Sequence, residues 1–342
     1  MTITSTAPRD WDSLISRAGG SVFHSTSWAR FAQASYANLT PEFLIGDADG
    51  ASPTYALVFH QRSRRRVLRG LTGHTWLDAY PIAPAYDPAA VATALTLIAD
   101  HARARGDVEV DLGSFGGGDI RDVLTPLAFT LAQRLEFQLD LTRPEQELWD
   151  AMATSRRQKI KKGQKHNVVV EEMTPDKGLP VLRALQDQSA IRIASRGGQM
   201  SAYTGPSETD PARTLIDCGV ARLWGARVGE VWVSAALLTC FNAQVYYMLS
   251  GHSARGLEVQ SSSILLWDAI RSYRANGATR FNLGGCSLDA VDERSAEHGV
   301  YMYKKGFGGA ILECANGHKT LRPTARRIRV ALNRLMRRGT AE

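Results

Sequence analysis

The sequence predicts an α+β protein made of two tandem copies of one domain. The phrase RARGDVEVDLGS (103–114) returns 171 residues later, in a chain of 342, as RANGATRFNLGG (274–285). In both copies good helix formers run up to a glycine, which suits a left-handed helix cap, and a short alternating strand follows. A candidate antiparallel hairpin precedes each copy. Two copies are too few for a repeat array, so we interpret the pattern as a duplicated domain.

The elements of each half follow from these signals. In the first half, TYALVFHQRSRRRVLRG (54–70) predicts a hairpin with its basic middle as the turn, and 89–105 predicts a helix that ends at Gly106. In the second half, 223–251 predicts antiparallel strands with turns at RVGE and FNAQ. A helix over 262–276 follows, with Ser261, Ser262 and Ser263 as candidate N-caps.

The boundary between the copies is predicted near Pro144, which suits the first turn of a new helix running through TSRRQKIKK (154–162). We expect domains at 1–144 and 145–317, each with a mixed, mainly antiparallel sheet flanked by helices. A C-terminal helix within 318–342 would complete the first domain. Its apolar stripe should dock on the body of the protein, with Ile328, Ala331, Leu332 and Leu335 inward.

The positive charge of the chain is concentrated in a few segments. Net charge is +7, and the stretch 322–338 alone holds seven arginines and no acid. Two further acid-free clusters are QRSRRRVLR (61–69) and SRRQKIKKGQKH (155–166). Such clusters favour a polyanionic partner such as nucleic acid. Solvated helix faces and hairpin tips are the alternative interpretation.

Composition and motifs argue against several other classes of protein. An apolar share of 44% is normal for a globular protein. No leader segment and no apolar run of ~18 residues is evident, so we expect a cytoplasmic protein without membrane insertion. Four scattered cysteines and the absence of C-x-x-C and H-E-x-x-H motifs give no support for a metal site. We expect neither metal nor cofactor.

Several phrases in order along the chain resemble the Fem family, the peptidoglycan bridge aminoacyltransferases with two GNAT-like domains. Besides the duplicated unit, they are FHSTSWARFA (23–32), LTRPEQELWDAMATSRRQKIKKGQK (141–165), LLWDAIRSYRANGATRFNLGG (265–285) and YMYKKGFGG (301–309). The resemblance implies transfer of an amino acid from aminoacyl-tRNA to an amine of a peptide, either a lipid- or nucleotide-linked muropeptide or an antibiotic peptide. The long helical arm of some members has no counterpart between 146 and 310.

An aminoacyl ester is already activated, so such an enzyme must position the amine, accept its proton and stabilise the oxyanion. By resemblance the Lys-Gly-Phe phrase lies at the reaction centre, and Lys305 is our candidate oxyanion stabiliser, with Lys304 beside it and Phe307 as a pocket wall. His298, in a predicted loop, has a suitable intrinsic pKa for a general base. Solvated lysines at a turn, and proton loss assisted by the substrate, remain alternatives.

Acceptor and tRNA contacts are predicted from charge and resemblance. An acceptor with phosphate or carboxylate groups needs cations, for which Arg192, Arg196 and Arg30 are candidates. TWLDAYPIAP (75–84) resembles the family's acceptor-groove segment, although its aromatic residues could equally be core; the candidates there are Trp76, Asp78 and Tyr80. The candidate tRNA contacts are Arg156, Arg157, Lys159, Lys161, Lys162, Arg326 and Arg327.

Two other functions compete with aminoacyl transfer. A GNAT-type enzyme with an acyl-CoA donor holds the pyrophosphate on an R/Q-x-x-G-x-G/A loop at a helix N-terminus. The corresponding stretch, GHSARGLEVQSSS (251–263), contains R-G but not the full spacing. A non-catalytic RNA-binding protein would explain the basic clusters, but not the lysine-glycine phrase.

Overall fold

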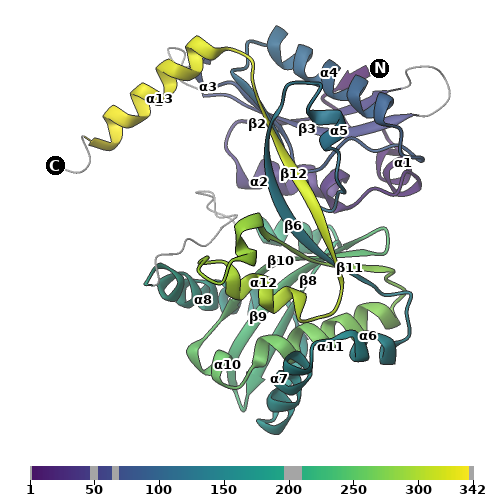
Figure 1. Ribbon diagram of the computed structural model, residues 1–342, viewed down its shortest axis with the longest axis vertical. Helices are drawn as coiled ribbons and strands as arrows, with labels where there is room; N and C mark the ends of the chain where they lie inside the picture. Colours follow the sequence, from purple (N-terminus) through teal and green to yellow (C-terminus); the bar gives the residue numbers. More distant parts are fainter. Residues whose placement is uncertain (1, 47–52, 64–68, 196–209, 339–342) are drawn as a thin grey trace. The chain divides into compact units, whose positions relative to one another are not determined.

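The chain forms two compact units, and the computed structural model describes residues 2–46, 53–63, 69–195 and 210–338 (Figure 1). Unit 1 comprises residues 1–133 and 314–342, and unit 2 comprises residues 134–313. The two divisions fall inside strands β6 (Thr130–Asp140) and β12 (Ala310–Thr320). Each of these strands therefore carries the chain from one unit into the other.

Unit 1 is a sheet in the order β1-β2-β3-β4-β5-β12, in which β4 and β5 are parallel and the other neighbours antiparallel. Its strands besides β12 are β1 (Thr2–Thr4), β2 (Leu39–Gly46), β3 (Thr54–Gln61), β4 (His74–Leu77) and β5 (Glu109–Leu112). Its helices are α1 (Trp11–Arg17), the short 3-10 helix Val22–His24, α2 (Thr26–Ser35), α3 (Arg69–Thr72), α4 (Pro88–Ala104), α5 (Arg121–Leu124) and α13 (Pro323–Arg338).

Alternation along the strands gives the sheet of unit 1 two buried faces. Leu44 and Ala56 pack in a cluster with Leu95 and Ile98 of α4. Their neighbours Phe43 and Tyr55 face the other way, where the Trp11 ring of α1 lies 5.0 Å and 6.0 Å from their rings. Because successive side chains of a strand point to opposite faces, helices cover both sides of this sheet.

Unit 2 repeats this plan in the order β6-β11-β10-β9-β8-β7, with β10 and β11 parallel and the other neighbours antiparallel. Its further strands are β7 (Val168–Met173), β8 (Ala221–Val228), β9 (Val231–Phe241), β10 (Gln244–His252) and β11 (Arg280–Ser287). Its helices are α6 (Glu145–Ala151), α7 (Thr154–Lys165), α8 (Pro175–Ala194), α9 (Pro211–Asp217), α10 (Ala254–Glu258), α11 (Ser261–Ala275), the 3-10 helix Leu288–Val291 and α12 (His298–Lys305).

The sheet of unit 2 is also covered on both faces. Leu223 lies against Gly178 of α8, whereas the ring of its neighbour Trp224 lies 6.2 Å from that of Tyr273 of α11. Figure 1 shows α11 and α8 beside the strands of this unit. The predicted duplication of an α+β domain with a mainly antiparallel sheet is therefore confirmed.

The repeated phrase has the same structure in both units. α4 and α11 end just before Gly106 and Gly277, whose φ angles of 79° and 84° are those of left-handed caps. The strands that follow, β5 and β11, each form the second member of the parallel pair. However, β6 follows β5 in sequence and pairs with β11, whereas β12 follows β11 and pairs with β5. The two units thus exchange their closing strands.

Several local predictions were wrong. β3 is followed by a helical turn, α3, and pairs with β2 and β4, whereas the basic residues 64–68 lie outside the described part. The helix expected from Pro144 to 162 is two helices, α6 and α7, broken at Met152 and Ala153. The serines do not cap α11, because Gln260 is its N-cap residue; Ser261 instead donates to the Gly256 carbonyl.

The apolar stripe of α13 is only partly buried, contrary to expectation. Ala325 in its first turn is 6% exposed, but Ile328 is 46% and Leu332 is 38% exposed. Leu335 lies outside the residues whose side chains are described. The Arg329 guanidinium, 2.5 Å from Glu109 of β5, ties the helix to unit 1. The helix is thus held on unit 1 by Ala325 and by the Arg329–Glu109 ion pair, and the side chains of Ile328 and Leu332 stay largely accessible.

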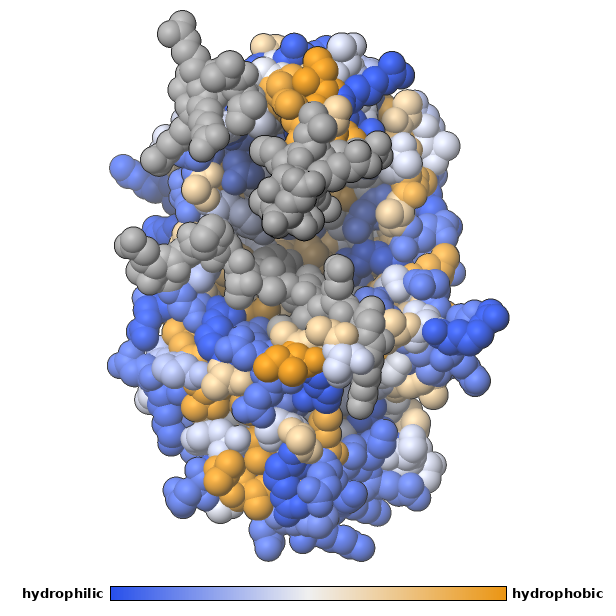
Figure 2. Space-filling model, turned by 90° about the vertical axis from the view of Figure 1, so that its left-hand side faces the viewer, coloured by the Kyte–Doolittle hydropathy of each residue, from blue (hydrophilic) through white to orange (hydrophobic). Residues whose placement is uncertain are grey.

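The helices of the described residues include no candidate for a membrane span. Among the described helices, none combines the length and the apolar character that crossing a bilayer needs. On the face drawn in Figure 2, hydrophobic residues form small separate patches among hydrophilic ones.

Candidate active site

In unit 2 the pairing of the two parallel strands stops partway along. β10 and β11 are paired only from Gln244 opposite Arg280 to Tyr246 opposite Asn282, although both strands continue. Beyond this point β11 carries a bulge, because two residues between Asn282 and Gly285 stand opposite one residue on β6. Gly284 lies in the bulge with a φ of 73°, a left-handed conformation that suits glycine. β10 has a register shift of its own between Tyr247 and Leu249.

Lys304 reaches this bulge from the last turn of α12. Its Nζ donates to the Gly285 carbonyl at 2.7 Å and lies 3.2 Å from where a Cβ of Gly284 would be. Burial lowers the pKa of Lys304 to about 8, because desolvation disfavours the charged ammonium group. Lys304 is therefore still largely protonated at neutral pH, beside a glycine that is itself buried.

A buried carboxylate holds the bulge in place. Glu136 of β6 is fully buried and accepts from Asn282 Nδ2 at 2.7 Å, Tyr246 Oη at 3.1 Å and Arg134 Nη1 at 2.8 Å. Asn282 in turn accepts from the Gly284 amide at 2.7 Å. These bonds satisfy a charge that burial alone would penalise. Glu136 thus fixes the positions of Tyr246 and Asn282, the last residues at which β10 and β11 pair.

The other candidates near the Lys-Gly-Phe phrase have different surroundings. Lys305 is exposed, with its Nζ 5.2 Å from the centre of the Tyr301 ring. His298 begins α12, and its Nδ1 lies 3.1 Å from the Ala290 carbonyl, which fits an imidazole protonated at Nδ1 with Nε2 as acceptor. Phe307 has no exposed surface and packs on the Tyr303 ring. The prediction of Phe307 as a pocket wall is therefore wrong.

The structure also contradicts the prediction that Arg156 contacts tRNA. Its side chain is 3% exposed and lies over the rings of Tyr303 and Phe307, at 4.2 Å and 4.9 Å. It donates to Ser263 Oγ and to the Tyr303 carbonyl, both at 2.7 Å. The helical period places Arg156 on the same face as Ile160 and therefore in the core. Arg156 joins α7 to α11 and α12.

The remaining predicted tRNA contacts are at least partly accessible. Lys159, Lys161 and Lys162 are exposed on α7, and Arg157 is partly exposed and donates to the Asp150 carbonyl. In unit 1, Arg326 and Arg327 are exposed on α13. An exposed basic face of α7 is consistent with contacts to phosphates, and those assignments stay predictions.

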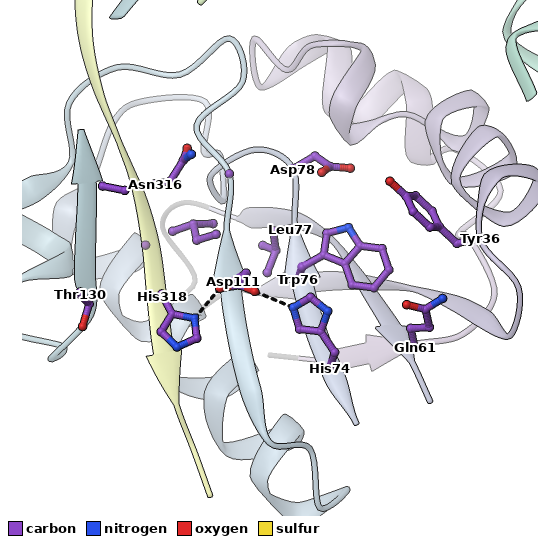
Figure 3. Close-up of a pocket in the computed structure, with 14 residues that line it drawn as sticks. Tyr36, Gln61, His74, Trp76, Leu77, Asp78, Asp111, Thr130, Asn316 and His318 are labelled. Atoms are coloured by element: carbon purple, nitrogen blue, oxygen red, sulfur yellow. Dashed lines mark hydrogen bonds and ion pairs between the residues drawn. The ribbon is translucent and has the colours of Figure 1, made fainter. Parts of the chain in front are cut away.

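Unit 1 contains a pocket of about 460 Å³ beside its parallel strands (Figure 3). Trp76 and Asp78, both predicted from sequence, line it. Its other lining residues are Tyr36, Gln61, His74, Leu77, Asp111, Leu112, Gly113, Thr130, Ala132, Asn316, Gly317 and His318. Sequence reasoning missed these, although Asp111 stands inside the repeated phrase.

Asp111 is the central charge of this pocket. Its two oxygens lie 2.7 Å from His74 Nε2 and 2.6 Å from His318 Nδ1, and Figure 3 shows the carboxylate between the two rings. Burial opposes ionisation of Asp111, but the two histidine hydrogen bonds outweigh it and lower its pKa. Asp78 differs: burial raises its pKa to about 6, against the hydrogen bond from Trp28 Nε1 at 2.8 Å.

The other predicted acceptor residues do not line this pocket. Tyr80 is buried and donates through its hydroxyl to the Ala315 carbonyl at 2.6 Å, so its predicted acceptor contact is wrong. Arg30 lines a separate hollow together with Arg9 and Asp12. Arg192, in unit 2, donates to the His252 carbonyl and to Ser189 Oγ. Arg196 lies outside the described residues.

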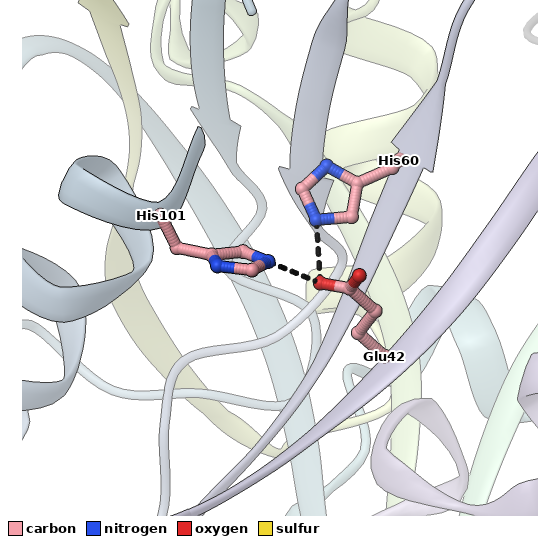
Figure 4. Close-up of side chains that lie close together, drawn as sticks. All are labelled: Glu42, His60 and His101. Atoms are coloured by element: carbon pink, nitrogen blue, oxygen red, sulfur yellow. Dashed lines mark hydrogen bonds and ion pairs between the residues drawn. The ribbon is translucent and has the colours of Figure 1, made fainter. Parts of the chain in front are cut away.

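Two groups of described side chains offer ligand atoms of the kinds that metal ions prefer. One is His74, Glu109 and Asp111 at the pocket; the other is Glu42, His60 and His101, in which both histidines approach the same Glu42 oxygen, at 2.7 Å and 2.9 Å (Figure 4). In the second group Arg105 also pairs with Glu42. Hydrogen bonds and ion pairs account for this buried cluster, which ties β2, β3 and α4 together.

Comparison with solved structures gives the same architecture. The chain is similar to a structure described as FemX, with a TM-score of 0.70, 14% identity and coverage of 92% of this chain and 97% of that one. It also matches the C-terminal domain of a putative lysylphosphatidylglycerol synthetase from Agrobacterium fabrum (TM-score 0.54, 14% identity, 94% and 95% covered). A tandem GNAT protein from the clavulanic acid biosynthesis pathway matches at 0.50 and 11% identity, with 94% and 98% covered.

The fold is that of two tandem GNAT-like domains, and the second carries a lysine at its interrupted strand pair. The FemAB family model matches residues 223–319, which run from β8 to β12 and include Lys304. The Fem-family resemblance of the sequence is confirmed by this match together with the shared fold. No curated protein matches the chain.

Proposed function

We propose that this protein transfers an amino acid from aminoacyl-tRNA to an amine of a peptide acceptor. In this reaction the amine attacks the ester carbonyl, and a new C–N amide bond replaces the C–O bond to the ribose. The amine loses a proton, and the ribose oxygen gains one. The reaction needs no further energy source, because the aminoacyl ester is already activated.

The observation that carries the proposal is the position of Lys304 at the bulge of β11. A charged ammonium group beside Gly284 can stabilise the negative charge that develops on the ester carbonyl oxygen. Glycine at this point adopts the left-handed φ of 73° that the bulge requires. Lys305, which the sequence favoured for this role, is exposed and points to Tyr301, so we assign the role to Lys304.

Acyl-CoA is the alternative donor, supported by the likeness to a tandem GNAT protein. Two features argue against it. Asp87 caps α4 through its carboxylate, at 2.9 Å from the Ala89 amide, and so puts negative charge where a pyrophosphate would bind. In unit 2 the R-G stretch before α11, which was compared with the pyrophosphate loop, lies in the short helix α10. A Cβ on Gly256 would meet the Val233 carbonyl at 2.2 Å, so this glycine is needed for packing.

The exposed lysines of α7 supply a surface for the tRNA. Lys161 and Lys162 are accessible in unit 2, the unit that also holds Lys304. Counterion release from the tRNA would make this contact strongly dependent on salt. Arg326 and Arg327 on α13 are a second, independent candidate contact, in unit 1. His298 remains a candidate proton acceptor.

A donor competition experiment tests the proposal. The protein is incubated with a mixed pool of radiolabelled aminoacyl-tRNAs and an acceptor panel of muropeptides and antibiotic peptides, and in parallel with labelled acetyl-CoA. We expect labelled amide product only from the aminoacyl-tRNA pool, and its formation should be abolished by prior ribonuclease treatment. Product from acetyl-CoA alone, insensitive to ribonuclease, would overturn the proposal in favour of the CoA-dependent alternative.

A further inference from the structure

Two histidines and one carboxylate meet on the sheet of unit 1, in a group that the proposed reaction does not use. His74 of β4, Asp111 of β5 and His318 of β12 stand on neighbouring strands, and Asp111 is directly opposite His318. Figure 3 shows the carboxylate between the two imidazole rings. His74 Nε2 lies 2.7 Å from one of its oxygens, and His318 Nδ1 lies 2.6 Å from the other. Side chains of the kinds that bind divalent transition metals therefore converge at this point.

Contacts outside the group hold both imidazole rings in place. The His74 ring is stacked on Trp76, with the ring centres 5.1 Å apart, and His318 Nε2 lies 3.1 Å from Thr320 Oγ1. A histidine that binds a metal through one nitrogen commonly bonds an outer partner through the other, which sets its tautomer and orientation. His318 has this arrangement, with Nδ1 toward Asp111 and Nε2 toward Thr320. Because a nitrogen lone pair and a carboxylate repel each other, either the ring's own proton or a metal ion must lie between them.

The spacing and exposure of the three side chains suit a metal ion. Zn²⁺ binds nitrogen and oxygen at about 2.0–2.2 Å, so two ligand atoms at a tetrahedral angle lie about 3.3–3.6 Å apart. Each imidazole nitrogen would therefore withdraw from the carboxylate by about 0.6–1 Å, which side chains can do while the strands stay in place. The side chains of Asp111, His74 and His318 are 42%, 28% and 31% accessible, so an ion can reach all three. Among the described residues that line the pocket beside them, none is lysine or arginine.

The second group of potential ligands in unit 1 lacks these properties. The Glu42 side chain is only 7% accessible, and besides its two histidines it is paired with the Arg105 guanidinium. The arginine already supplies the positive charge that a metal ion would bring, and it would repel such an ion. Asp111 has only neutral or titratable histidines as its hydrogen-bond partners among the described side chains. A metal ion is therefore favoured at Asp111 over Glu42.

We propose that His74, Asp111 and His318 form a binding site for one divalent transition-metal ion of the Zn²⁺ class. Glu109 is close enough to His74 and Asp111 to be a further ligand, but it is paired with Arg329. Three protein ligands leave a coordination position open toward the pocket, and the bound ion ties β12 to β4 and β5. The expectation of no metal rested on sequence motifs, whereas these ligands lie far apart in the chain. The inference is independent of the proposed function, which uses no metal.

Metal binding to the intact protein tests the inference. The protein is freed of metal with a chelator, and Zn²⁺, Mg²⁺ and Ca²⁺ are titrated separately by calorimetry. We expect saturable binding of a single Zn²⁺ ion and no saturable binding of Mg²⁺ or Ca²⁺, because imidazole suits transition metals whereas those two ions prefer oxygen ligands. A titration with Co²⁺ gives a second readout, since the visible absorption of bound Co²⁺ reports its coordination. A protein that binds no Zn²⁺, or binds Mg²⁺ or Ca²⁺ more tightly, would overturn the inference.

Variants of the ligands locate the site. His74→Ala, His318→Ala and Asp111→Asn should each weaken Zn²⁺ binding at least about 100-fold, since even the loss of an outer partner typically costs about 10–100-fold. Thr320→Val removes such a partner and should weaken binding about tenfold. Denaturant unfolding of each variant shows that it is folded, and Asp111→Asn keeps the shape of the side chain.

Two histidine variants serve as matched controls. His101→Ala changes the second group of potential ligands, and His166→Ala changes an exposed histidine at the end of α7. Both should bind Zn²⁺ as the wild type does. If His101→Ala abolishes binding, or if the variants of His74, His318 and Asp111 all keep the wild-type affinity, the ion is bound by other groups and the inference is wrong.

Discussion

The two parallel strand pairs of this protein start from the same sequence phrase and end differently. In unit 1, β4 and β5 stay paired to Leu77 and Leu112, and the Gly113 amide then bonds the Leu77 carbonyl at 2.7 Å. In unit 2, β10 and β11 cease to pair after Tyr246 and Asn282. The first pair borders a pocket with two carboxylates; the second exposes a bulge to a lysine. One duplicated framework thus carries two sites of opposite charge.

Gly113 and Gly284, equivalent by the 171-residue offset, show how this difference arises. A Cβ on Gly113 would meet the Asp78 carbonyl at 2.7 Å, so this glycine allows close packing inside unit 1. Gly284 has a φ of 73° and sits beside Lys304 Nζ. The same residue of the repeat therefore serves close packing in one unit and a left-handed bulge in the other.

The largest expected stability effect is in unit 2, at Arg156. Arg156→Met should lower the free energy of unfolding by about 2–4 kcal/mol, because it removes two buried hydrogen bonds and leaves Ser263 and the Tyr303 carbonyl without their donor. Denaturant unfolding measures this loss, and the salt dependence of tRNA binding should stay unchanged. Lys165→Met, on the exposed side of the same helix, is the control. A fully stable Arg156→Met variant would show that Arg156 has no structural role.

The equivalent glycines provide the next test. Gly113→Ala should destabilise the protein by about 1–3 kcal/mol, since the Asp78 backbone must move to admit a methyl group. Gly284→Ala should cost about 1–2 kcal/mol in left-handed strain, and should slow transfer more than it lowers stability. Chemical denaturation and single-turnover assays of both variants separate the two effects. If the two variants lost the same stability and also the same activity, the two glycines would not differ in function between the units.

Acid should affect unit 1 through Asp107. Burial raises its pKa, but hydrogen bonds from His60, Thr75 and Arg62 outweigh this and bring it to about 2, below the ordinary value of 3.8. Because the pKa of Asp107 is lower in the folded than in the unfolded protein, its ionised carboxylate stabilises the fold above pH 4. About 2 kcal/mol of the unfolding free energy is lost as pH falls from 4 to 2. Unfolding free energy measured across this range should lose much of that slope in Asp107→Asn. An unaltered slope would assign the acid sensitivity to other groups.

The smallest expected effects concern the exposed lysines of α7. Replacing Lys161 and Lys162 by serine should leave stability unchanged and reduce the slope of log affinity for tRNA against log salt by about 1–2, as the loss of two phosphate contacts predicts. Filter binding over a salt series gives the slope. The matched control is Lys177→Ser on α8, whose Nζ lies over the Trp232 ring. The same slope in both variants would remove α7 from the tRNA contact.

The sequence predicts the parts of the fold that depend on local signals. Gly106 and Gly277 mark helix ends because only local backbone conformation decides a left-handed cap. The exchange of β6 and β12 could not be predicted, since both have ordinary strand patterns and their partners lie far away in the chain. Likewise, the pocket brings together Asp111 and His318, which are 207 residues apart. The phrase YKKGFGG indicated a lysine at the site, but choosing between Lys304 and Lys305 requires knowing that α12, and not a strand, carries them.

The direct test of the account compares these two neighbouring lysines in one assay. Single-turnover transfer from aminoacyl-tRNA is measured for the wild type, Lys304→Met and Lys305→Met, with tRNA affinity and unfolding determined for each. We predict that Lys304→Met slows transfer about 10²–10³-fold, the usual loss when one oxyanion donor is removed, and that Lys305→Met transfers at nearly the wild-type rate. A slow Lys305→Met beside a fully active Lys304→Met would contradict the central claim.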